Sequence, residues 1–278
     1  MASGMKQGMT GWIEKALGPL SGARGKPSRL APNEAPFPRL TLPGEPTLIY
    51  AIGDVHGCID HLRLLEQRIV ADGRLTPGLK LIVMLGDYVD RGPNSAGVLD
   101  HLIAPAPDGF RRLCLRGNHD DMLLRLVEGT VDPEWWLEFG GAETLFSYGY
   151  DLQHLAGDRR RAVSDIIRRF AREMPPTHLA FLKRLPAALT TPRYFFCHAG
   201  VRPGVSLEEQ SDEDLLWVRA PFLEHKGAPF ERTIIHGHTP SKKPFVSRYR
   251  IGLDTNACRG GKLSVARIAA DGVRILSV

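Results

Sequence analysis

The stretch LIVMLGDYVDRGPNSAGVLDHL, residues 81–102, shapes the interpretation of the whole 278-residue sequence. Its apolar start predicts a buried β-strand, and the turn that follows holds Asp87, Asp90 and Arg91. One explanation is a charged turn that caps the next helix, because Asp and Gly are common at strand-to-helix junctions. The other explanation is a functional site at the end of the strand. The remaining sequence must distinguish the two.

The composition is that of an ordinary globular protein, with 43% hydrophobic and 24% charged residues. No apolar run approaches the roughly 18 residues of a membrane span, and the N-terminus lacks the apolar core of a signal peptide. The four cysteines form no CxxC pair. We therefore expect free thiols and a cytoplasmic protein.

The net charge of +5 is concentrated near the N-terminus. Residues 1–46 contain six Lys or Arg and three Asp or Glu, so they carry +3 and leave only +2 for the remaining 232 residues. The same segment has seven Pro and seven Gly, a content typical of poorly ordered chain. We expect a flexible extension over 1–46, which leaves open a contact with a partner. A body so close to neutral does not favour nucleic-acid binding.

From residue 47 the sequence has the rhythm of βαβ units. Five apolar segments each break at Gly: TLIYAIG, LKLIVMLG, FRRLCLRG, RYFFCHAG and RTIIHGHTP. Helical patterns lie between the first three, at a spacing typical of a sheet covered on both faces. Residues 130–190 predict a helical insertion, and short strands follow residue 245. We therefore expect one α/β domain over 47–278.

Polar clusters follow every one of these strands. They read GDVHG, GDYVDRG, GNHD, HAG and HGHTP. In open α/β sheets, ligands bind outside the carboxyl ends of the strands. Helix caps explain single aspartates, but they do not explain histidines at the same level of the sheet. Carboxylate, amide and imidazole groups without thiolate suit Mn²⁺, Fe or Zn²⁺, so a metal site is predicted.

In this order and spacing, GDVHG, GDYVDRG, GNHD, HAG and GHTP resemble the phosphoprotein phosphatase superfamily of metallophosphoesterases. The likeness is greatest to its bacterial and phage serine/threonine phosphatases, and it covers residues 48–278. It implies a four-layer sandwich, in which two mixed β-sheets are flanked by helices. It also implies two divalent metal ions at the sheet edge, with Mn²⁺ expected first and Fe or Zn²⁺ as alternatives.

The resemblance assigns the ligands residue by residue. The first metal would take Asp54, His56 and Asp87; Asp87 would bridge to a second metal held by Asn118, His198 and His238. Many calcineurin-like phosphoesterases carry GHxH, whereas this chain has Pro240 at the last position. That difference fits the phosphoprotein phosphatase branch, whose first metal uses only Asp, His and Asp.

The resemblance also implies the reaction. A hydroxide shared by two metals would attack phosphorus in line, and His119, oriented by Asp90, would protonate the leaving group. Arg91 and Arg219 would hold phosphate oxygens together with Asn118. His236 is expected to support the ligands from behind, and Asp254 to help fix the site. Trp135, Trp136 and Phe139 are expected to pack the insertion.

These features predict a phosphomonoester hydrolase of the serine/threonine protein phosphatase type. Its substrate would be a phosphorylated protein or a small phosphorylated molecule, with no nucleic acid or membrane as a partner. One alternative is symmetrical diadenosine tetraphosphate hydrolysis, in a sister branch that tends to lack the aspartate equivalent to Asp90. Another is a metal-binding pseudophosphatase that acts as a scaffold, although none of the six ligand positions has been lost.

Overall fold

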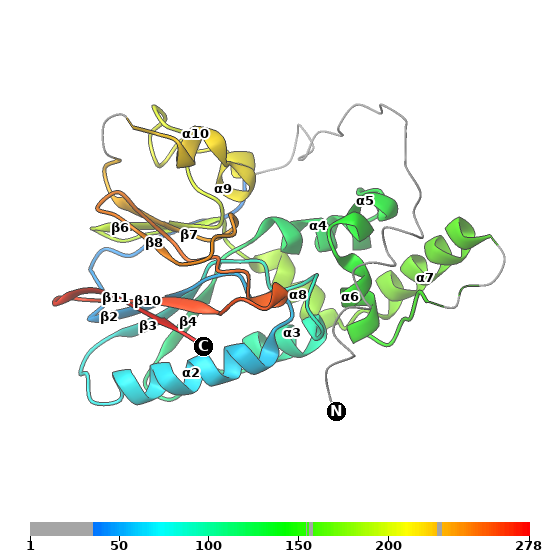
Figure 1. Cartoon of the computed structure of the whole chain (residues 1–278), viewed down its shortest axis with the longest axis horizontal. Coiled ribbons are helices and arrows are strands. Elements are labelled where there is room, and N and C mark those ends of the chain that lie inside the picture. Colours follow the sequence, from blue (N-terminus) through cyan, green and yellow to red (C-terminus); the bar gives the residue numbers. More distant parts are fainter. Residues whose placement is uncertain (1–35, 154, 156–157, 227–229) are drawn as a thin grey trace. The chain divides into compact units, whose positions relative to one another are not determined.

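Two β-sheets packed face to face form the centre of the molecule, with helices on their outer faces (Figure 1). The computed structural model describes residues 36–153, 155, 158–226 and 230–278, which belong to one compact unit. The expected α/β sandwich of two mixed sheets flanked by helices is confirmed.

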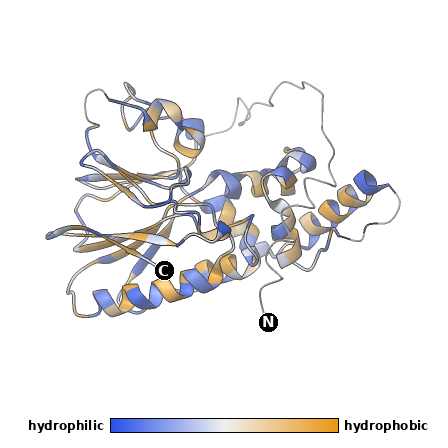
Figure 2. Cartoon of the chain, in the orientation of Figure 1, coloured by the Kyte–Doolittle hydropathy of each residue, from blue (hydrophilic) through white to orange (hydrophobic). Residues whose placement is uncertain are grey.

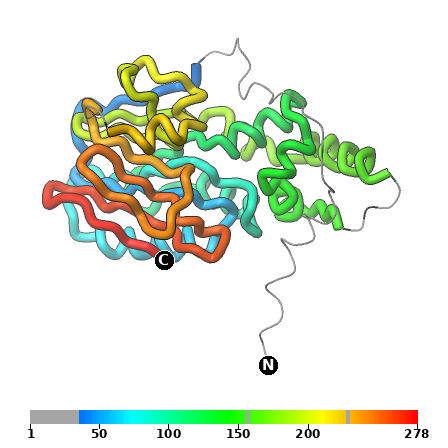
Figure 3. The backbone as a smooth tube through the Cα atoms, turned by 45° about the horizontal axis from the view of Figure 1, so that its top comes forward, coloured from blue at the N-terminus to red at the C-terminus, as the bar shows by residue number. Residues whose placement is uncertain are grey.

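The first sheet contains the strands that the early apolar segments predicted. Its order is β11-β10-β2-β3-β4, with β2 (Leu48–Ile52), β3 (Lys80–Met84), β4 (Arg111–Cys114), β10 (Ser264–Ala269) and β11 (Gly272–Ser277). Strands β2, β3 and β4 are parallel, so their carboxyl ends share one edge. The C-terminal hairpin β10–β11 extends the sheet in antiparallel fashion and is the red ribbon of Figure 3.

The second sheet contributes the later site segments. Its order is β1-β5-β6-β7-β9-β8, with β1 (Arg39–Thr41), β5 (Ala188–Thr190), β6 (Tyr194–Cys197), β7 (Thr233–His236), β8 (Phe245–Val246) and β9 (Arg250–Gly252). Strands β6, β7 and β9 are parallel. Their carboxyl ends therefore also lie together at one edge.

The alternation of side chains along β2 divides the core into two layers. Ile49 and Ala51 pack between the sheets with Phe196 and Ile235. Leu48, Tyr50 and Ile52 point to the helical side. Because both faces of the strand are covered, all five of its residues are buried. This explains why the segment reads as a continuous apolar run.

Helices cover both outer faces and form the insertion. They are α2 (Ile59–Gly73), α3 (Ser95–Ile103), α4 (Asn118–Val127), α5 (Pro133–Glu138), α6 (Gly141–Ser147), α7 (Arg159–Glu173), α8 (Pro176–Arg184), α9 (Asp212–Trp217), α10 (Ala220–Leu223) and the 3₁₀ turn Ala257–Arg259. Helices α2 and α7 carry apolar and polar stripes (Figure 2). Such stripes let one face of a helix pack inward while the other stays in water.

The helical character expected for 130–190 is present in α5 to α8. These helices appear green beside the sheets in Figure 3. Trp136 of α5 stacks on Phe170 of α7, with ring centroids 6.5 Å apart and planes 10° apart. The last helix ends at Arg184, so the final residues of the expected range belong to β5 instead.

The domain begins earlier than residue 47. Strand β1 pairs in parallel with β5, and Arg39 forms an ion pair with Asp212 at 2.8 Å. Phe37 lies under the guanidinium of Arg116, 4.1 Å from it. The expected flexible extension is therefore wrong for residues 36–46. Their apolar stretch is short and lies between prolines, so no clear strand pattern is visible in the sequence there. Residues 1–35 lie outside the described part of the chain.

Within the described ranges, no helix combines the length and the apolar character needed to cross a membrane. The four cysteines are free thiols, as expected. Two of them, Cys58 and Cys197, are buried.

Candidate active site

The loops that follow β2, β3, β6 and β7 are joined by backbone hydrogen bonds. The N–H groups of Val55 and His56 both donate to the carbonyl of Asp87, at 3.1 and 2.8 Å. The N–H of Gly237 donates to the carbonyl of His198 at 2.8 Å. Each sheet thus fixes its own pair of polar loops. The predicted site residues lie on these fixed loops.

Backbone strain is concentrated in the same loops. Among the described residues, six that are not glycine have a positive φ: His56, Asp87, Asp90, Arg91, His238 and Asn256. Five of these six were predicted as site residues from the sequence. A left-handed conformation costs such residues about 1–3 kcal/mol each, and such strain clusters at functional sites. The backbone therefore marks the same location as the motifs.

The carboxylate of Asp87 lies between two histidines. Its Oδ1 is 3.4 Å from Nε2 of His198, and its Oδ2 is 3.4 Å from Nε2 of His56. The backbone N–H of His119 donates to Oδ1 at 3.0 Å. One carboxylate oxygen thus faces each histidine, which is the arrangement that a carboxylate bridging two cations needs.

Carbonyl groups fix the orientation of both histidines. Nδ1 of His56 lies 2.7 Å from the carbonyl of Val89, and Nδ1 of His198 lies 2.9 Å from that of Leu85. Each Nδ1 donates its hydrogen to the carbonyl, so each Nε2 is turned toward Asp87. A metal-binding histidine is commonly held in this way, with its other ring nitrogen bonded to a backbone carbonyl.

A second group of possible ligands surrounds Asn118. Its Oδ1 lies 2.8 Å from Nε2 of His198 and 2.9 Å from Nδ1 of His238. The ligand atoms of Asp87, His198 and His238 all lie within 4.8 Å of one another. All four side chains are buried. The structure therefore brings together the residues expected for the second metal.

The first group differs in one member from the expected set. His56 and Asp87 come within 4.8 Å of His119 rather than of Asp54. Asp54 is buried nearby, where its two oxygens accept the backbone N–H of His238 at 3.1 and 3.0 Å. Position 237 has no room for a side chain, because a Cβ there would lie 1.9 Å from Oδ1 of Asp54. Asp54 thus holds the loop of His238 in this structure.

The electrostatic field at the centre favours positive charge. Burial works against the charged form of His198, but the carboxylates of Asp87 and Asp54 raise its pKa to about 9. Burial, with the repulsion of Asp254, raises the pKa of Asp54 well above its usual range. Removing acids from water in this way is costly unless cations neutralise them. Divalent ions would relieve this repulsion, and the oxygen and nitrogen donor set suits them.

His119 and Asp90 form a buried pair beside the first group. Nδ1 of His119 lies 2.7 Å from Oδ2 of Asp90. The other ring nitrogen, Nε2, is buried and has no hydrogen-bond partner within the described part of the chain. Burying a polar nitrogen without a hydrogen bond is unfavourable in free energy, so such atoms are uncommon in protein interiors. His119 also belongs to one group of possible ligands with His56 and Asp87.

Burial shifts the two members of this pair in opposite directions. It raises the pKa of Asp90 to about 7, although a hydrogen bond from Thr144 works the other way. It lowers the pKa of His119 to about 3, with Asp87 opposing the shift. Asp90 therefore retains a proton closer to neutral pH than an ordinary aspartate, so that the pair can carry an additional proton.

Two guanidinium groups border the candidate ligands. Nη1 of Arg91 lies 2.8 Å from Nε2 of His56, and Nε of Arg219 donates to Nε2 of His238 at 3.1 Å. One arginine thus lies beside each ligand group. Their planar donors suit the oxygens of a phosphate.

His236 lies behind the site. Its Nδ1 is 3.0 Å from the carbonyl of Gly237, and its Nε2 is 3.3 Å from Nη1 of Arg250. Its ring also packs against Phe222. Both ring nitrogens therefore face groups outside the two ligand sets, in line with the supporting role expected from the sequence.

Asp120 is a site residue that the sequence reasoning missed. It is fully buried, and its Oδ2 accepts the N–H groups of Asp87 and Gly117 at 2.8 and 2.9 Å. Its Oδ1 accepts the N–H of Tyr88 at 2.9 Å. One side chain thus ties the loop after β3 to the loop after β4. Its position in GNHD was the only signal available in the sequence.

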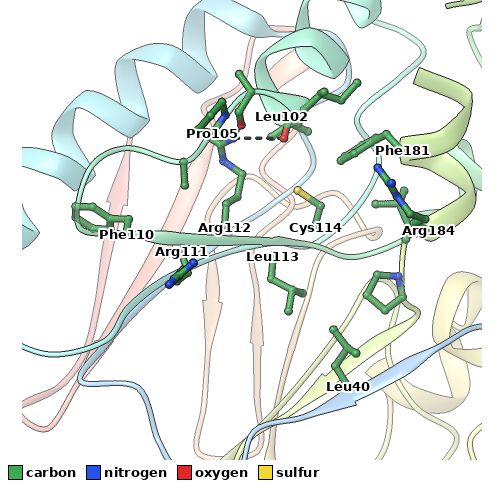
Figure 4. Close-up of a pocket in the computed structure, with 15 residues that line it drawn as sticks. Leu40, Leu102, Pro105, Phe110, Arg111, Arg112, Leu113, Cys114, Phe181 and Arg184 are labelled. Atoms are coloured by element: carbon green, nitrogen blue, oxygen red, sulfur yellow. Dashed lines mark hydrogen bonds between the residues drawn. The ribbon is translucent and has the colours of Figure 1, made fainter. Parts of the chain in front are cut away.

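A separate pocket of about 610 Å³ lies along β4 (Figure 4). Its lining includes Leu40, Arg112, Cys114 and Phe181, and none of the predicted site residues belongs to it. The side chain of Arg112 donates to the carbonyl of Ala104 at 3.0 Å there. This pocket is therefore distinct from the candidate active site.

Comparison with known proteins agrees with this geometry. Residues 47–265 match the model of the calcineurin-like phosphoesterase family. The match spans most of the chain, so the protein belongs to the calcineurin-like phosphoesterases. The metallophosphoesterase class that the motifs resembled is thereby confirmed.

Individual named relatives share about a quarter of their residues with this chain. Asymmetrical bis(5′-nucleosyl)-tetraphosphatase PrpE from Bacillus thuringiensis (strain Al Hakam) is 24% identical over 234 residues, which are 78% of this chain and 88% of that protein. The protein of the same name from Bacillus cereus (strain Q1) is 24% identical over 233 residues, again 78% of this chain and 88% of its own length.

Solved structures support the fold. The crystal structure of a putative diadenosine tetraphosphatase superposes with a TM-score of 0.59 at 22% identity, covering 87% of this chain and 97% of its own. A protein serine/threonine phosphatase from Saccharomyces cerevisiae, similar to human PP5, gives 0.50 at 15% identity, covering 86% and 82%. At these identities the superpositions show a shared architecture.

Proposed function

We propose that this chain is a phosphomonoester hydrolase, with phosphoserine or phosphothreonine in a protein as its substrate class. The observation that carries the proposal is the buried pair of Asp90 and His119, in which Nε2 of His119 has no hydrogen-bond partner among the described residues. Divalent ions, when bound, would supply the activated water and offset the charge of the phosphoryl oxygens. The residues of the chain supply the remaining steps.

Arg91 and Arg219 bind the phosphate and orient it. They flank the two ligand groups, so that phosphate oxygens between them meet a guanidinium from either side. Holding the phosphoryl group in a fixed position relative to His119 aligns the leaving oxygen with the proton donor and thereby speeds the reaction. Asn118, whose amide lies between His198 and His238, is suited to contact the same oxygens.

His119 donates a proton to the oxygen that leaves. With Asp90 protonated and donating to Nδ1, the hydrogen of the ring resides on Nε2. When Nε2 gives that hydrogen to the leaving oxygen, Nδ1 takes the proton of Asp90 and the carboxylate becomes charged. A positioned acid of this kind gives about 10²- to 10⁴-fold in rate.

The identity of the leaving group favours a monoester of an alcohol. A serine alkoxide is a poor leaving group, so that it needs a proton as the P–O bond breaks. A nucleotide released from a dinucleoside polyphosphate already leaves as a stable anion. A fully buried Asp90–His119 pair is therefore of most use to an enzyme that cleaves alkyl phosphates.

A second candidate is hydrolysis of dinucleoside tetraphosphates. The names of the Bacillus relatives support it. Those proteins are described as asymmetrical, whereas the sequence alone had suggested the symmetrical reaction as the alternative. The same metal residues and arginines would serve such a substrate, with less need for His119.

The experiment compares the wild type with His119→Asn on three substrates in the presence of Mn²⁺. These are a phosphoserine peptide, p-nitrophenyl phosphate and diadenosine tetraphosphate. We expect kcat to fall about 10²-fold or more on the peptide and far less on p-nitrophenyl phosphate, whose leaving group is a stable anion. His61→Asn, which changes a histidine outside the site, is the matched control.

Arg91→Ala provides a second comparison, because it should slow all phosphomonoesters to a similar extent. Equal losses for His119→Asn on peptide and aryl phosphate, with unchanged metal content, would remove His119 from the acid role. Faster wild-type turnover of diadenosine tetraphosphate than of the peptide would favour the second candidate.

A further inference from the structure

Helices α5 and α6 of the insertion reach into the pair formed by Asp90 and His119. The hydroxyl of Thr144, in α6, donates to Oδ1 of Asp90 at 2.7 Å. The indole N–H of Trp136, in α5, donates to Oδ2 at 3.2 Å. Both side chains are fully buried, with no exposed surface. The two oxygens of Asp90 are therefore each held by the insertion.

Thr144 also holds the backbone of Asp90. Its Oγ1 accepts the N–H of Asp90 at 2.8 Å and lies 3.0 Å from Oγ of Ser95. One hydroxyl thus contacts both the main chain and the carboxylate of the same residue. Such a double contact limits rotation of the Asp90 side chain, whose backbone has a φ of 68°. A left-handed backbone persists only where its surroundings hold it in place.

A third contact joins the insertion to the same loop. The N–H of Arg91 donates to the carbonyl of Gly140, between α5 and α6, at 2.9 Å. Gly140 has a φ of 96°, and a Cβ there would lie 2.7 Å from Cγ of Arg91. This part of the insertion therefore holds two consecutive residues of GDYVDRG, and no residue of α5 or α6 belongs to either ligand group.

These contacts determine which oxygen of Asp90 faces His119. Because Thr144 occupies Oδ1, only Oδ2 meets Nδ1 of His119, at 2.7 Å. If the carboxylate rotated, the imidazole would lose the partner that fixes its hydrogen and its tilt. An imidazole displaced by a fraction of an ångström donates its proton poorly, because proton transfer needs close hydrogen-bond geometry.

We propose that Thr144 and Trp136 are positioning residues for the proton donor, so that the insertion determines how well the enzyme expels poor leaving groups. This inference rests on the proposed function, in which His119 is the acid. Neither residue belongs to the two groups of candidate metal ligands. Their loss should therefore impair proton donation selectively.

Two conservative variants isolate the contacts. Thr144→Val keeps the shape of the side chain and removes its hydroxyl, while Thr144→Ser restores the hydroxyl without the methyl group. Trp136→Phe removes the N–H and keeps an aromatic ring against Phe170. Thr130→Val is the matched control, because it removes a hydroxyl that donates to the carbonyl of Arg125, at 3.1 Å, away from Asp90 and His119.

The measurement is kcat in Mn²⁺ for a series of phosphomonoesters, from p-nitrophenyl phosphate to a phosphoserine peptide. For Thr144→Val we expect a loss of about 10-fold or more on the peptide and little change on the aryl ester, as a fraction of the full acid effect. Trp136→Phe should show the same bias more weakly. Thr144→Ser and Thr130→Val should resemble the wild type.

Equal losses on all esters, or no loss on the peptide, would overturn the inference. His119→Asn, measured in parallel, separates the two proposals. If that variant shows the bias and the Thr144 and Trp136 variants do not, only the positioning role fails. If His119→Asn shows no bias, the acid role fails and the positioning role fails with it. Should Thr144→Val not fold, the result for Trp136→Phe is the one that counts.

Discussion

The carboxylate of Asp120 accepts the backbone N–H of Asp87 at 2.8 Å and so fixes the residue that faces both ligand groups. The same oxygen accepts the N–H of Gly117, and the other accepts that of Tyr88. One side chain that receives three backbone donors holds this junction in place.

Asp120→Asn should weaken metal binding without removing a ligand. An amide can replace only one of the two oxygens, so that its NH₂ group would face backbone donors. We expect a loss of about 1–3 kcal/mol in the free energy of unfolding and a lower affinity for Mn²⁺. Denaturant titration and calorimetric metal binding provide the two measurements. Asp108→Asn, at an exposed aspartate, is the control; equal behaviour of the two variants would contradict this role.

Asp87→Asn should remove both metals, whereas His238→Ala should remove mainly one. Only Asp87 belongs to both ligand groups. Elemental analysis after dialysis against Mn²⁺ measures the metal content of each variant directly. In the wild type, activity should be lost on chelation and return when Mn²⁺ is supplied. Two full equivalents of metal in Asp87→Asn would show that the carboxylate does not bridge.

Glu66→Gln should destabilise the protein only above acidic pH. Burial opposes the ionisation of Glu66, but hydrogen bonds from His101 and Arg112, at 2.8 and 2.6 Å, outweigh it and lower the pKa of this carboxyl below its usual 4.5. A depressed pKa adds stability above the unfolded value, and that stability is lost as the pH falls through the folded value.

We therefore expect Glu66→Gln to lose about 1–3 kcal/mol at pH 7, with the difference from wild type shrinking below pH 4.5. Urea unfolding at several pH values measures it. Glu138→Gln, at an exposed glutamate, should match the wild type throughout. A difference that stays constant down to low pH would show that the charge of Glu66 is not the cause.

A chain beginning at Pro36 should be more stable than one beginning at Glu45. The longer chain keeps β1, its pairing with β5 and the ion pair of Arg39 with Asp212. Thermal unfolding of the two chains, and of Arg39→Ala in the full chain, measures the contribution of this strand. Identical melting temperatures would show that the strand adds nothing to the fold.

Much of the architecture follows from the sequence, because buried parallel strands read as apolar runs. The segment before Asp87 is such a run, and its strand lies where it was predicted. Strand β1 was missed because three residues flanked by prolines carry no periodicity.

The candidate site was predictable to a similar degree. Asp87 follows a strand of the first sheet, whereas His198 and His238 follow strands of the second. The family resemblance grouped these three residues in advance, and the structure brings their ligand atoms together. Trp136 was expected only to pack, and it does stack on Phe170, but it also donates to Asp90. The role of Thr144 depends on how the insertion folds back, and no local pattern in the sequence encodes that.

The insertion has a consequence for how the enzyme responds to heating. Peripheral helices open at lower cost than a central sheet, and such opening can occur while the rest of the molecule stays folded. If α5 and α6 open first, Asp90 loses the donors on both its oxygens while the ligand residues on the sheet edge keep their places. On warming, cleavage of the phosphoserine peptide would then decline before that of the aryl ester, so that substrate preference would itself report the opening of one small part of the molecule.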